Sequence, residues 1–431
     1  MASASDFKIA ILGAGPAGLT LASLLTASTH AFNFTVFERR DKPDPANVDI
    51  PSGSLDLQEE FGLAAVKACG LHSHFLEFDS GCTEQTKITD RNGTVLLDKV
   101  GEGRPEISRN ALTQLLLSGV PPDKIRWNTK VLSVTPADGK EKGVVEFTDG
   151  KSPFLTETFD LIVGADGAWS RARTAIPGAA QPIYSGAIAV TLDVPNLQER
   201  HPDLDVLLGG GTFAACGDGK VLLTQRAPNH TARLYLFIHS NCQAETREQF
   251  KDSSHDGKFG PDPALTAHRL ISTLPTNHKN LKDFLLSDPD FFPVWPENIK
   301  HLIAVTCDAQ PADAKVDVAP LYMLPLDPFP HPHTPGLALV GDAAHLLTPF
   351  AGKGVNTAMA DTMYLAKQLD ALFSSASAEG TFEEKLDNAL IAFEEESHAK
   401  GKAAMVLTWM SLLLSYEEGA PARLVKVMAS K

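Results

Sequence analysis

The chain has 431 residues, of which 43% are hydrophobic and 21% charged, and its formal net charge is −15 from 53 acidic and 38 basic side chains. This composition is ordinary for a globular protein, and the length predicts two domains or one domain with a layered insertion. Nucleic acids and anionic membranes bind basic surfaces, so the acidic balance argues against both as partners.

The five cysteines are scattered and form no CxxC pair. We therefore expect isolated reduced thiols, with neither a disulfide framework nor a metal site. The first predicted strand begins near Phe7, which leaves no room for a signal peptide. The longest apolar stretch, residues 403–414, falls short of the roughly 20 residues that span a bilayer. These features predict a cytoplasmic protein without stable membrane insertion.

The N-terminal segment combines a glycine turn with two strands. A strand over residues 7–12 runs into GAGPAG and a leucine-rich helical pattern, and a second strand, residues 32–37, ends at Glu38. Glycines permit a tight turn and close approach of the backbone to a pyrophosphate, and the carboxylate suits ribose hydroxyls. The segment predicts dinucleotide binding, with a chance glycine turn as the alternative, and does not separate NAD from FAD. The predicted contacts in this turn are Gly13, Gly15, Pro16, Ala17 and Gly18.

Helical patterns follow over residues 58–71 and after Ser108. Serine is a preferred N-cap residue, which would place Arg109 in the first turn of the second helix. A cation there opposes the helix dipole, so Arg109 is expected to bind an outside anion such as a phosphate. The alternative is a surface arginine in a salt bridge.

Short strands at residues 125–127, 131–134 and 144–147 predict a small antiparallel meander, with turns at residues 138–139 and 149–150. An apolar strand over residues 159–163 then leads into GADG and a helix that carries Ser170 and two arginines. This second strand-to-glycine transition contains Asp166 and Gly167.

The middle of the chain alternates in a strand-like manner between residues 183 and 239, with glycine-rich turns, and predicts a mainly antiparallel sheet that forms a pocket on one face. Residues 263–287 have helical patterns. The aromatic run at residues 291–296 is interpreted as core packing, with substrate stacking as the alternative.

The C-terminal clamp, residues 337–361, is the segment around which the site is expected to form. A strand over residues 337–340 ends at Gly341 and Asp342, and a glycine-rich crossing follows before the helical pattern after Asn356. The carboxylate can accept hydrogen bonds from hydroxyls, and glycines and the helix N-terminus suit an electron-rich ring. The alternative is an ordinary strand–loop–helix connection. His345 is interpreted as a residue that orders the loop, not as a base, and residues 381–431 are expected to be helical.

Three motifs now stand in one order: GAGPAG at 13–18, GADGAWSRAR at 164–173 and GDAAHLLTPFAGKGVN at 341–356. In this the chain resembles the single-component FAD-dependent aromatic hydroxylases, the group A flavoprotein monooxygenases. SGSLDL at 52–57 and PEISRN at 105–110 look most like the tetracycline-inactivating branch. The middle motif and residues 183–240 depart from that branch, so the cofactor assignment transfers and the tetracycline assignment does not.

The resemblance implies an α/β fold in which a Rossmann-like FAD-binding domain is interleaved with a mainly antiparallel β-sheet substrate domain, followed by C-terminal helices. The expected FAD-binding parts are residues 1–180 and 326–375. The substrate domain would span residues 181–325 and the helices residues 376–431.

The resemblance also implies roles for single residues in the adenosine half of the cofactor site. Gly13, Gly15 and Gly18 would approach the FAD pyrophosphate. Glu38 would contact the adenosine ribose and Arg39 the adenosine side of the cofactor.

In the flavin half, Arg109 matches a family arginine that contacts the cofactor, and Asp56 a carboxylate near the isoalloxazine. Asp342 would hold the ribityl chain, Pro349 would lie beside the ring, and Asn356 would line its pyrimidine edge. The other clamp residues assigned to the cofactor are Gly341, Gly352, Gly354 and Val355.

The activity implied is that of an FAD-dependent monooxygenase, which uses NADPH or NADH and O₂ to place one oxygen atom in an aromatic or polycyclic small molecule through a flavin C4a-hydroperoxide. Hydroxylation is the first expectation, with epoxidation or Baeyer–Villiger insertion as variants. Asp166 and Gly167 match a motif associated with both FAD and the reduced nucleotide. The chemistry is flavin-centred, so no catalytic side chain is assigned. A dehydrogenase, a halogenase and a non-catalytic flavin-binding protein are the alternatives.

Overall fold

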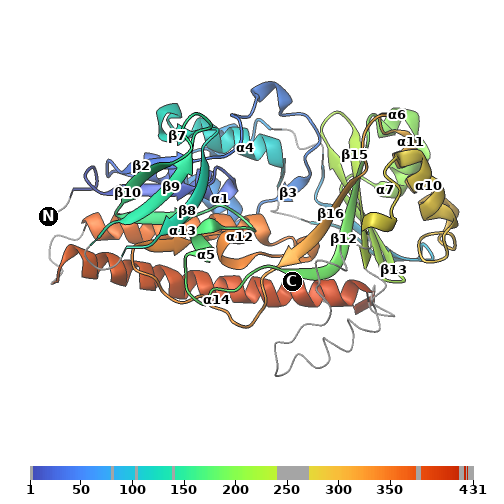
Figure 1. The fold of residues 1–431 in the computed structure, drawn as a ribbon. Coiled ribbons are helices and arrows are strands. Elements are labelled where there is room, and N and C mark those ends of the chain that lie inside the picture. Colours follow the sequence, from blue (N-terminus) through green and yellow to red (C-terminus); the bar gives the residue numbers. More distant parts are fainter. Residues whose placement is uncertain are drawn as a thin grey trace.

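The computed structural model describes residues 3–78, 82–101, 105–137, 141–239, 271–374 and 380–416, together with residues 422, 423 and 425. Its first layer is a five-stranded parallel sheet with the order β17-β11-β1-β2-β7 (Figure 1). The strands are β1 (Lys8–Leu12), β2 (Asn33–Phe37), β7 (Ile125–Arg126), β11 (Leu161–Gly164) and β17 (Leu337–Leu339). Because carboxyl ends of parallel strands share one edge, the three motifs that follow β1, β11 and β17 lie at adjacent positions.

The two faces of this sheet are covered differently. Ile9 and Ile11 of β1 pack into a core with the helices α1 (Pro16–Ala27), α4 (Arg109–Ser118) and α13 (Gly354–Ser374). Ala10 and Leu12 alternate with them and pack against a three-stranded antiparallel sheet. This sheet has the order β10-β9-β8, with β8 (Lys130–Thr135), β9 (Gly143–Thr148) and β10 (Leu155–Phe159). Because successive side chains of β1 point to opposite faces of the parallel sheet, both faces are buried at this strand.

The first strand of the predicted meander belongs elsewhere. Residues 125–126 pair in parallel with β2 and extend the large sheet, so their assignment to the meander was wrong. Ile125 is buried in the helix-covered core, and the chain then turns at Asn128, whose φ is +55°, before the meander begins. The predicted turn at residues 138–139 lies outside the described residues; β8 and β9 pair on either side of it.

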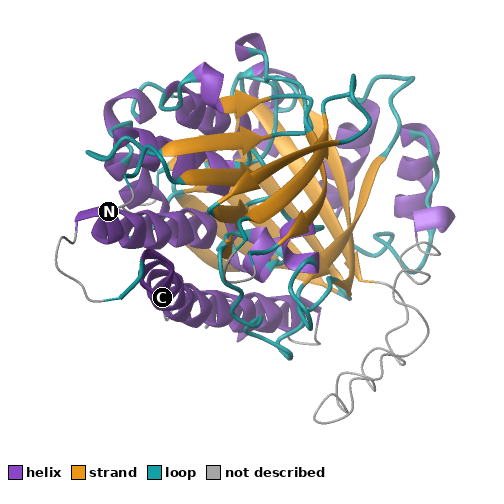
Figure 2. Ribbon diagram, turned by 60° about the vertical axis from the view of Figure 1, so that its left-hand side comes forward, coloured by secondary structure: helices purple, strands orange, loops and turns teal. Residues whose placement is uncertain are grey.

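The second sheet has seven strands in the order β16-β12-β15-β14-β13-β4-β5. The strands of the protein are drawn in orange in Figure 2, with helices on their outer sides. Its strands are β4 (Gln85–Asp90), β5 (Val95–Val100), β12 (Ile183–Val194), β13 (Thr212–Gly217), β14 (Lys220–Ala227), β15 (Thr231–His239) and β16 (Asp317–Met323). All neighbours are antiparallel except β13 and β4, which confirms the mainly antiparallel prediction. Because β4 and β5 come from residues 85–100, the sheet also draws on chain that precedes residue 181.

Helices cover the outer face of the second sheet, away from the parallel sheet (Figure 1). They are α6 (Leu197–Arg200), α7 (Pro202–Leu208), α10 (His278–Ser287) and α11 (Glu297–Asp308). Phe291, Phe292 and Trp295 are buried in this outer core, so the packing interpretation of the aromatic run is confirmed. The helical prediction for residues 263–270 lies outside the described residues.

The long helix α14 (Phe382–Tyr416) runs beneath both sheets and joins the two halves (Figure 1). It contacts α13 and α12 in the first half and reaches β13 and β14 in the second. The shorter elements are η1 (Pro45–Asn47), β3 (Ser54–Asp56), α2 (Gly62–Ala68), α3 (His72–Phe75), β6 (Glu106–Ser108), η2 (Pro122–Lys124), α5 (Arg171–Thr174), α12 (Asp342–His345) and η3 (Pro349–Ala351).

Within the described part of the chain, every helix is too short or too polar to cross a membrane. The same residues bring together no group of three side chains suited to a metal ion.

Candidate active site

The glycine turn after β1 is shaped by close packing and by open space. A Cβ on Gly18 would lie 1.9 Å from the carbonyl oxygen of Gly13, and a Cβ on Gly13, whose φ is +106°, would lie 2.5 Å from that of Ala165. A Cβ on Gly15 would meet nothing within 4 Å. Gly13 and Gly18 therefore let strand, helix and middle motif approach one another, whereas Gly15 leaves the backbone accessible.

Helix α1 begins beside that accessible backbone. Its N-cap, Gly15, makes no side-chain capping bond, Pro16 stands in the first turn, and the first turn carries no acidic residue. Ala17 is buried against the neighbouring elements. The first N–H groups of a helix have no intrahelical acceptor, so this terminus is suited to a phosphate.

Glu38 is buried at the end of β2, where both carboxylate oxygens accept hydrogen bonds. Oε2 accepts from the Ala14 N–H at 2.8 Å, and Oε1 from the Arg40 N–H and Nε, each at 2.9 Å. Burial raises the pKa of Glu38, but these bonds outweigh it and hold the pKa below its usual value. Arg39 is exposed, and it is Arg40 that orients the carboxylate. The chain bends at residues 39 and 40, so the alternation of a strand did not indicate that Arg40 would be the partner of Glu38.

Arg109 is the first residue of α4, and the Ser108 hydroxyl caps this helix by accepting from the Ala111 N–H at 3.1 Å, as predicted. The guanidinium is exposed, and its charge acts on Asp342. No carboxylate of the described residues forms an ion pair with Arg109, so the salt-bridge alternative finds no support there. Arg109 and Asp342 therefore face one site, although they are far apart in the sequence. Both are predicted to contact the cofactor.

The middle motif is joined to the clamp by Arg173, which is almost fully buried. Its guanidinium donates to the carbonyls of Asp342 at 3.2 Å and Ala343 at 2.9 Å, and also to that of Ala168. The sequence predicted an arginine behind the motif without this role. The cation therefore fixes the position of one cofactor motif relative to another.

Asp166 lies between Gly164 and the start of α5. Its Oδ2 accepts from the Arg171 N–H at 2.6 Å, while its Oδ1 is buried and has no hydrogen-bond partner among the described residues. Burial raises the pKa of this carboxyl. Gly167 follows with a φ of +78°, and a Cβ there would meet nothing within 4 Å. The motif therefore retains an acceptor oxygen and accessible backbone.

The start of the clamp is fixed by a buried carboxylate that sequence reasoning missed. Asp361 accepts at Oδ2 from the Gly341 N–H at 2.8 Å and from His345 Nε2 at 2.6 Å, and at Oδ1 from Ser397 at 2.7 Å. Burial lowers the pKa of His345, but attraction to Asp361 outweighs it and the pKa is raised. His345 thus orders the loop, as predicted. The available signal was a lone carboxylate among the apolar residues of the helical pattern.

Gly341 and Asp342 meet different surroundings. A Cβ on Gly341, whose φ is +60°, would lie 3.0 Å from that of Ala358 and 3.3 Å from that of Ala17. Asp342 has surface exposed to solvent, but the protein around its carboxyl removes part of the hydration of the charged form. This desolvation raises the pKa of the carboxyl, against the opposing attraction of His345, Arg109 and Arg173. Asp342 is therefore an acceptor that faces outward from a crowded turn.

Asn356 holds two segments together. Its Oδ1 accepts from the N–H groups of Gln58 at 2.8 Å and Gly62 at 3.2 Å, and its Nδ2 donates to the Asp56 carbonyl at 2.8 Å. The predicted helix over residues 58–71 is wrong at its start: α2 begins only at Gly62, and the Gln58 N–H before it is bonded to Asn356. The amide is thus used within the protein, and its predicted contact with the cofactor stays a prediction.

The loop before α13 contains the remaining clamp residues, and it brings Gly352 close to Asp56. A Cβ on Gly352, which has a φ of +60°, would lie 3.6 Å from Asp56 Oδ1, and one on Gly354 would meet nothing within 4 Å. Pro349 is exposed and Val355 half-buried. Helix α13 begins at Gly354, so its first N–H groups are available to an acceptor.

The second sheet presents an aromatic face to this loop. Along β15, Tyr235 and Phe237 alternate with Leu234 and Leu236, which belong to the outer core. The Phe237 ring lies 5.0 Å from that of Phe350 in the clamp, and Tyr235 is stacked on Phe237 at 5.9 Å. Apolar and aromatic side chains therefore stand over the end of the clamp.

A second anchor joins this sheet to β3. The Gln225 side chain accepts from the Ser54 N–H at 3.2 Å and donates to the Ser54 carbonyl at 3.1 Å. No local signal pointed to this pairing, because the two residues are 171 positions apart.

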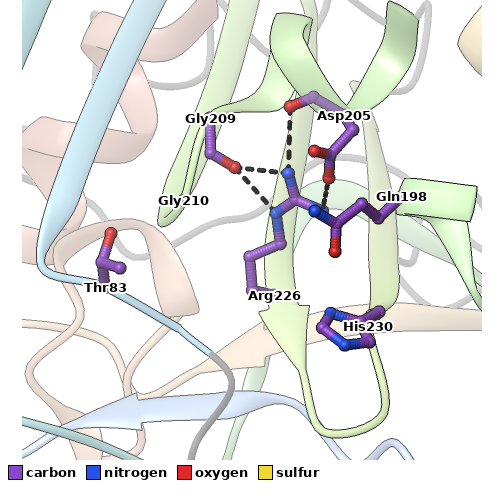
Figure 3. A pocket seen from close by; sticks show the side chains of 7 residues that line it. All are labelled: Thr83, Gln198, Asp205, Gly209, Gly210, Arg226 and His230. Carbon is purple, nitrogen blue, oxygen red and sulfur yellow. Dashed lines mark hydrogen bonds and ion pairs between the residues drawn. The ribbon is translucent and has the colours of Figure 1, made fainter. Parts of the chain in front are cut away.

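A hollow of about 380 Å³ opens on the outer side of β14 (Figure 3). Its most conspicuous group, Arg226, forms an ion pair with Asp205 at 2.8 Å and donates to the carbonyls of Asp205 and Gly209. The guanidinium is therefore occupied in holding the turn after α7. Arg226 alternates with Gln225 along the strand, so this hollow faces away from the clamp.

These surroundings fit FAD. The turn at Gly15 and the start of α1 suit its pyrophosphate, and Glu38 stands at the end of the next strand, where a ribose is bound in such folds. Asp342 offers an acceptor for hydroxyls, and the start of α13 offers donors for the electron-rich edge of a flavin. All of them lie along one edge of the parallel sheet.

Comparison with known proteins agrees with this arrangement. The family model described as "FAD binding domain" matches residues 6–275 and 333–387. "Monooxygenase penA" of Penicillium thymicola is 55% identical over 432 residues, which cover all of both chains. The chain therefore belongs to the FAD-binding-domain family of FAD-dependent monooxygenases.

Solved structures share the fold. HpxO of Klebsiella pneumoniae, in complex with FAD and uric acid, has a TM-score of 0.69 at 17% identity, with 99% of this chain and 92% of that chain covered. Tetracycline destructase Tet(51) has a TM-score of 0.63 at 19% identity, with coverages of 98% and 96%. At these identities the likeness establishes the fold alone. Tet(51) belongs to the tetracycline-inactivating branch, which residues 52–57 and 105–110 resemble.

Proposed function

We propose that this enzyme uses NADPH or NADH and O₂ to insert one oxygen atom into an aromatic or polycyclic small molecule, with hydroxylation as the reaction. One observation carries the proposal: the aromatic face of the second sheet meets the cofactor clamp at the contact between Phe237 and Phe350. An apolar wall beside a flavin site is suited to a flat, apolar substrate.

Bound FAD supplies the electron transfer and oxygen chemistry, and the chain supplies position and shielding. Gly15 and the start of α1 bind the pyrophosphate, Glu38 the ribose, and Asp342 the ribityl hydroxyls. Arg109 places a positive charge on the cofactor's side of the site, where it favours an anionic group. The sheet face excludes water from the reacting centre, which limits loss of reducing equivalents to peroxide.

The reduced nucleotide is expected to dock transiently on the FAD-binding half. The sequence has one GxGxxG unit, at residues 13–18, and this turn is assigned to FAD. Asp166 and Gly167 are the proposed contacts, because the motif retains an acceptor oxygen and accessible backbone. Comparison of NADPH and NADH oxidation rates will show which nucleotide the enzyme prefers.

The test begins with the visible spectrum of the purified protein, before and after addition of FAD. NADPH and NADH oxidation is then followed with a panel of tetracyclines and polycyclic phenols, under ¹⁸O₂, with products identified by mass. We expect a flavin spectrum, oxidation stimulated by at least one compound, and a product that carries one labelled oxygen atom.

Each alternative gives a different result. Oxidation of a compound without incorporation of label would indicate a dehydrogenase, and a product halogenated when halide is supplied would indicate a halogenase. A flavin spectrum with no turnover of any compound would indicate a binding protein. Failure to bind FAD would contradict the whole assignment.

A further inference from the structure

The hydroxyl of Tyr416, the last residue of α14, is buried and has no hydrogen-bond partner among the residues that the structure describes. Buried polar groups in folded proteins nearly always have a partner, and those that lack one call for a specific explanation. The explanation for Tyr416 lies in what surrounds it.

Aromatic contacts connect Tyr416 to the cofactor clamp. Its ring lies 5.7 Å from that of Phe350, in an edge-on arrangement, and Phe350 in turn lies 5.0 Å from Phe237. On its other side Tyr416 meets the ring of His239 at 4.8 Å. Phe237 and His239 are two residues apart on β15, so both point from the same face of the sheet. Tyr416 therefore closes one end of the aromatic wall that stands over the clamp.

On one side of this wall, β12 places Ala189 opposite Phe237 on the same face, whereas on the other side β14 carries Val221 and Leu223. Ala189 of β12 and Ala214 and Cys216 of β13 belong to the cluster that contains Phe350 and Tyr416. Ala189 keeps the β12 side of the sheet surface low beside the aromatic rings. A low apolar floor next to an aromatic wall is suited to a flat ring system, and it offers such a ligand few polar contacts.

The hydroxyl of Tyr416 acts as a donor in this environment. Burial raises the pKa of Tyr416 well above its usual range, so the phenol keeps its proton throughout the neutral range. Tyr184 and Cys216 are close enough to affect it electrostatically. The Tyr416 hydroxyl forms a hydrogen bond with neither of them, and a thiol is in any case a weak acceptor. The group that would complete this site is an oxygen acceptor.

We propose that Tyr416 is a specificity-determining residue, which donates a hydrogen bond to an oxygen atom on the flat ring system of the substrate. The proposal rests on the proposed function, because it places the substrate between the clamp and the sheet. The recognised chemistry is a phenol or a conjugated carbonyl on a polycyclic ring. The rest of the wall is mainly aromatic and aliphatic, which favours flat ring systems.

The test uses the FAD-loaded protein and isothermal titration calorimetry with matched probes: 1-naphthol against naphthalene, and 9-phenanthrol against phenanthrene. The variant is Tyr416→Phe, which keeps the ring and removes only the hydroxyl. The control is Tyr364→Phe, which makes the same change on α13, where Tyr364 packs against the core of the first sheet. Thermal unfolding and the flavin spectrum of each variant verify that fold and cofactor are retained.

We expect the wild-type protein to bind at least one phenol about 5- to 100-fold more tightly than its parent hydrocarbon, the range for one buried hydrogen bond. In Tyr416→Phe this ratio should fall to near one with hydrocarbon affinity unchanged, and Tyr364→Phe should keep the wild-type ratio. An unchanged ratio in Tyr416→Phe overturns the proposal, as does a wild-type protein that binds no phenol more tightly than its hydrocarbon. Either result leaves the proposed function intact if FAD binds and a labelled product forms.

Discussion

The three hydrogen bonds of the Asn356 side chain give a prediction that separates a structural role from a cofactor contact. Asn356→Ala removes the acceptor for the Gln58 and Gly62 N–H groups and the donor to the Asp56 carbonyl. Each net bond contributes about 0.5–1.5 kcal/mol, and each buried donor left without a partner costs about 1–3 kcal/mol. Since the Asn356 side chain and both N–H groups are buried, we expect a loss of about 3–5 kcal/mol in the free energy of unfolding.

Asn356→Asp provides the matched variant. It keeps the Oδ1 acceptor for both N–H groups, but it replaces the donor to Asp56 by an oxygen and adds a buried negative charge. We therefore expect this variant to lose stability at neutral pH and to recover part of it at acidic pH, where the protonated carboxyl can donate to the Asp56 carbonyl. The assay is urea unfolding of the FAD-free proteins, followed by circular dichroism, together with FAD titration of each variant. A FAD-free Asn356→Ala protein as stable as wild type, with only FAD affinity reduced, would refute the reasoning and show that the amide serves the cofactor directly.

Three further predictions follow from the same contacts. Arg173→Met should weaken FAD binding about tenfold or more in a fluorescence titration, because the loss of even one charged hydrogen bond lowers affinity by about that factor. The control is Arg171→Met, exposed on the same short helix, which should bind FAD normally. Gly15→Ala should leave the FAD-free protein stable and reduce FAD affinity, but Gly18→Ala should impair folding itself, because its Cβ would lie 1.9 Å from the Gly13 oxygen; equal stability of the two FAD-free variants would contradict this. His345 has a raised pKa, so its stabilising pairing with Asp361 is fully present below about pH 6.5 and is lost as pH rises through the folded pKa. The stability advantage of wild type over His345→Gln should therefore shrink with rising pH. Thermal unfolding of both proteins from pH 5 to 9 measures this, and an advantage that grows would contradict it.

Local signals in the sequence identified the cofactor motifs because each is continuous in the chain. The turn at Gly13 to Gly18, the capped helix that begins at Arg109 and the strand that ends at Gly341 all follow from residues within a few positions of one another. Backbone conformation and capping are local interactions, and a few residues are enough to determine them. The mainly antiparallel character of the second sheet was readable for the same reason, from alternation along single strands.

Long-range pairing was decided only in the folded chain. The short strand at Ile125 joined the large sheet and not the meander, because a two-residue strand carries no pattern that selects its partner. Residues 85–100 joined the second sheet in the same way. Strand pairing depends on which edge is open at a given place in the fold, and local propensity contains no information about that.

The sequence by itself determined the three motifs, the spacing of Glu38 and the clamp, which are properties of the chain order, and their resemblance to a known family identified the cofactor as FAD. Only the tertiary structure decided which side chains hold the motifs in place, since Arg173 and Asp361 act on groups supplied by other elements. It also placed Tyr416, from the end of the last long helix, against Phe350 in the clamp. A buried partner is specified by three-dimensional proximity and by the need to satisfy each polar group, and neither can be read from spacing along the chain.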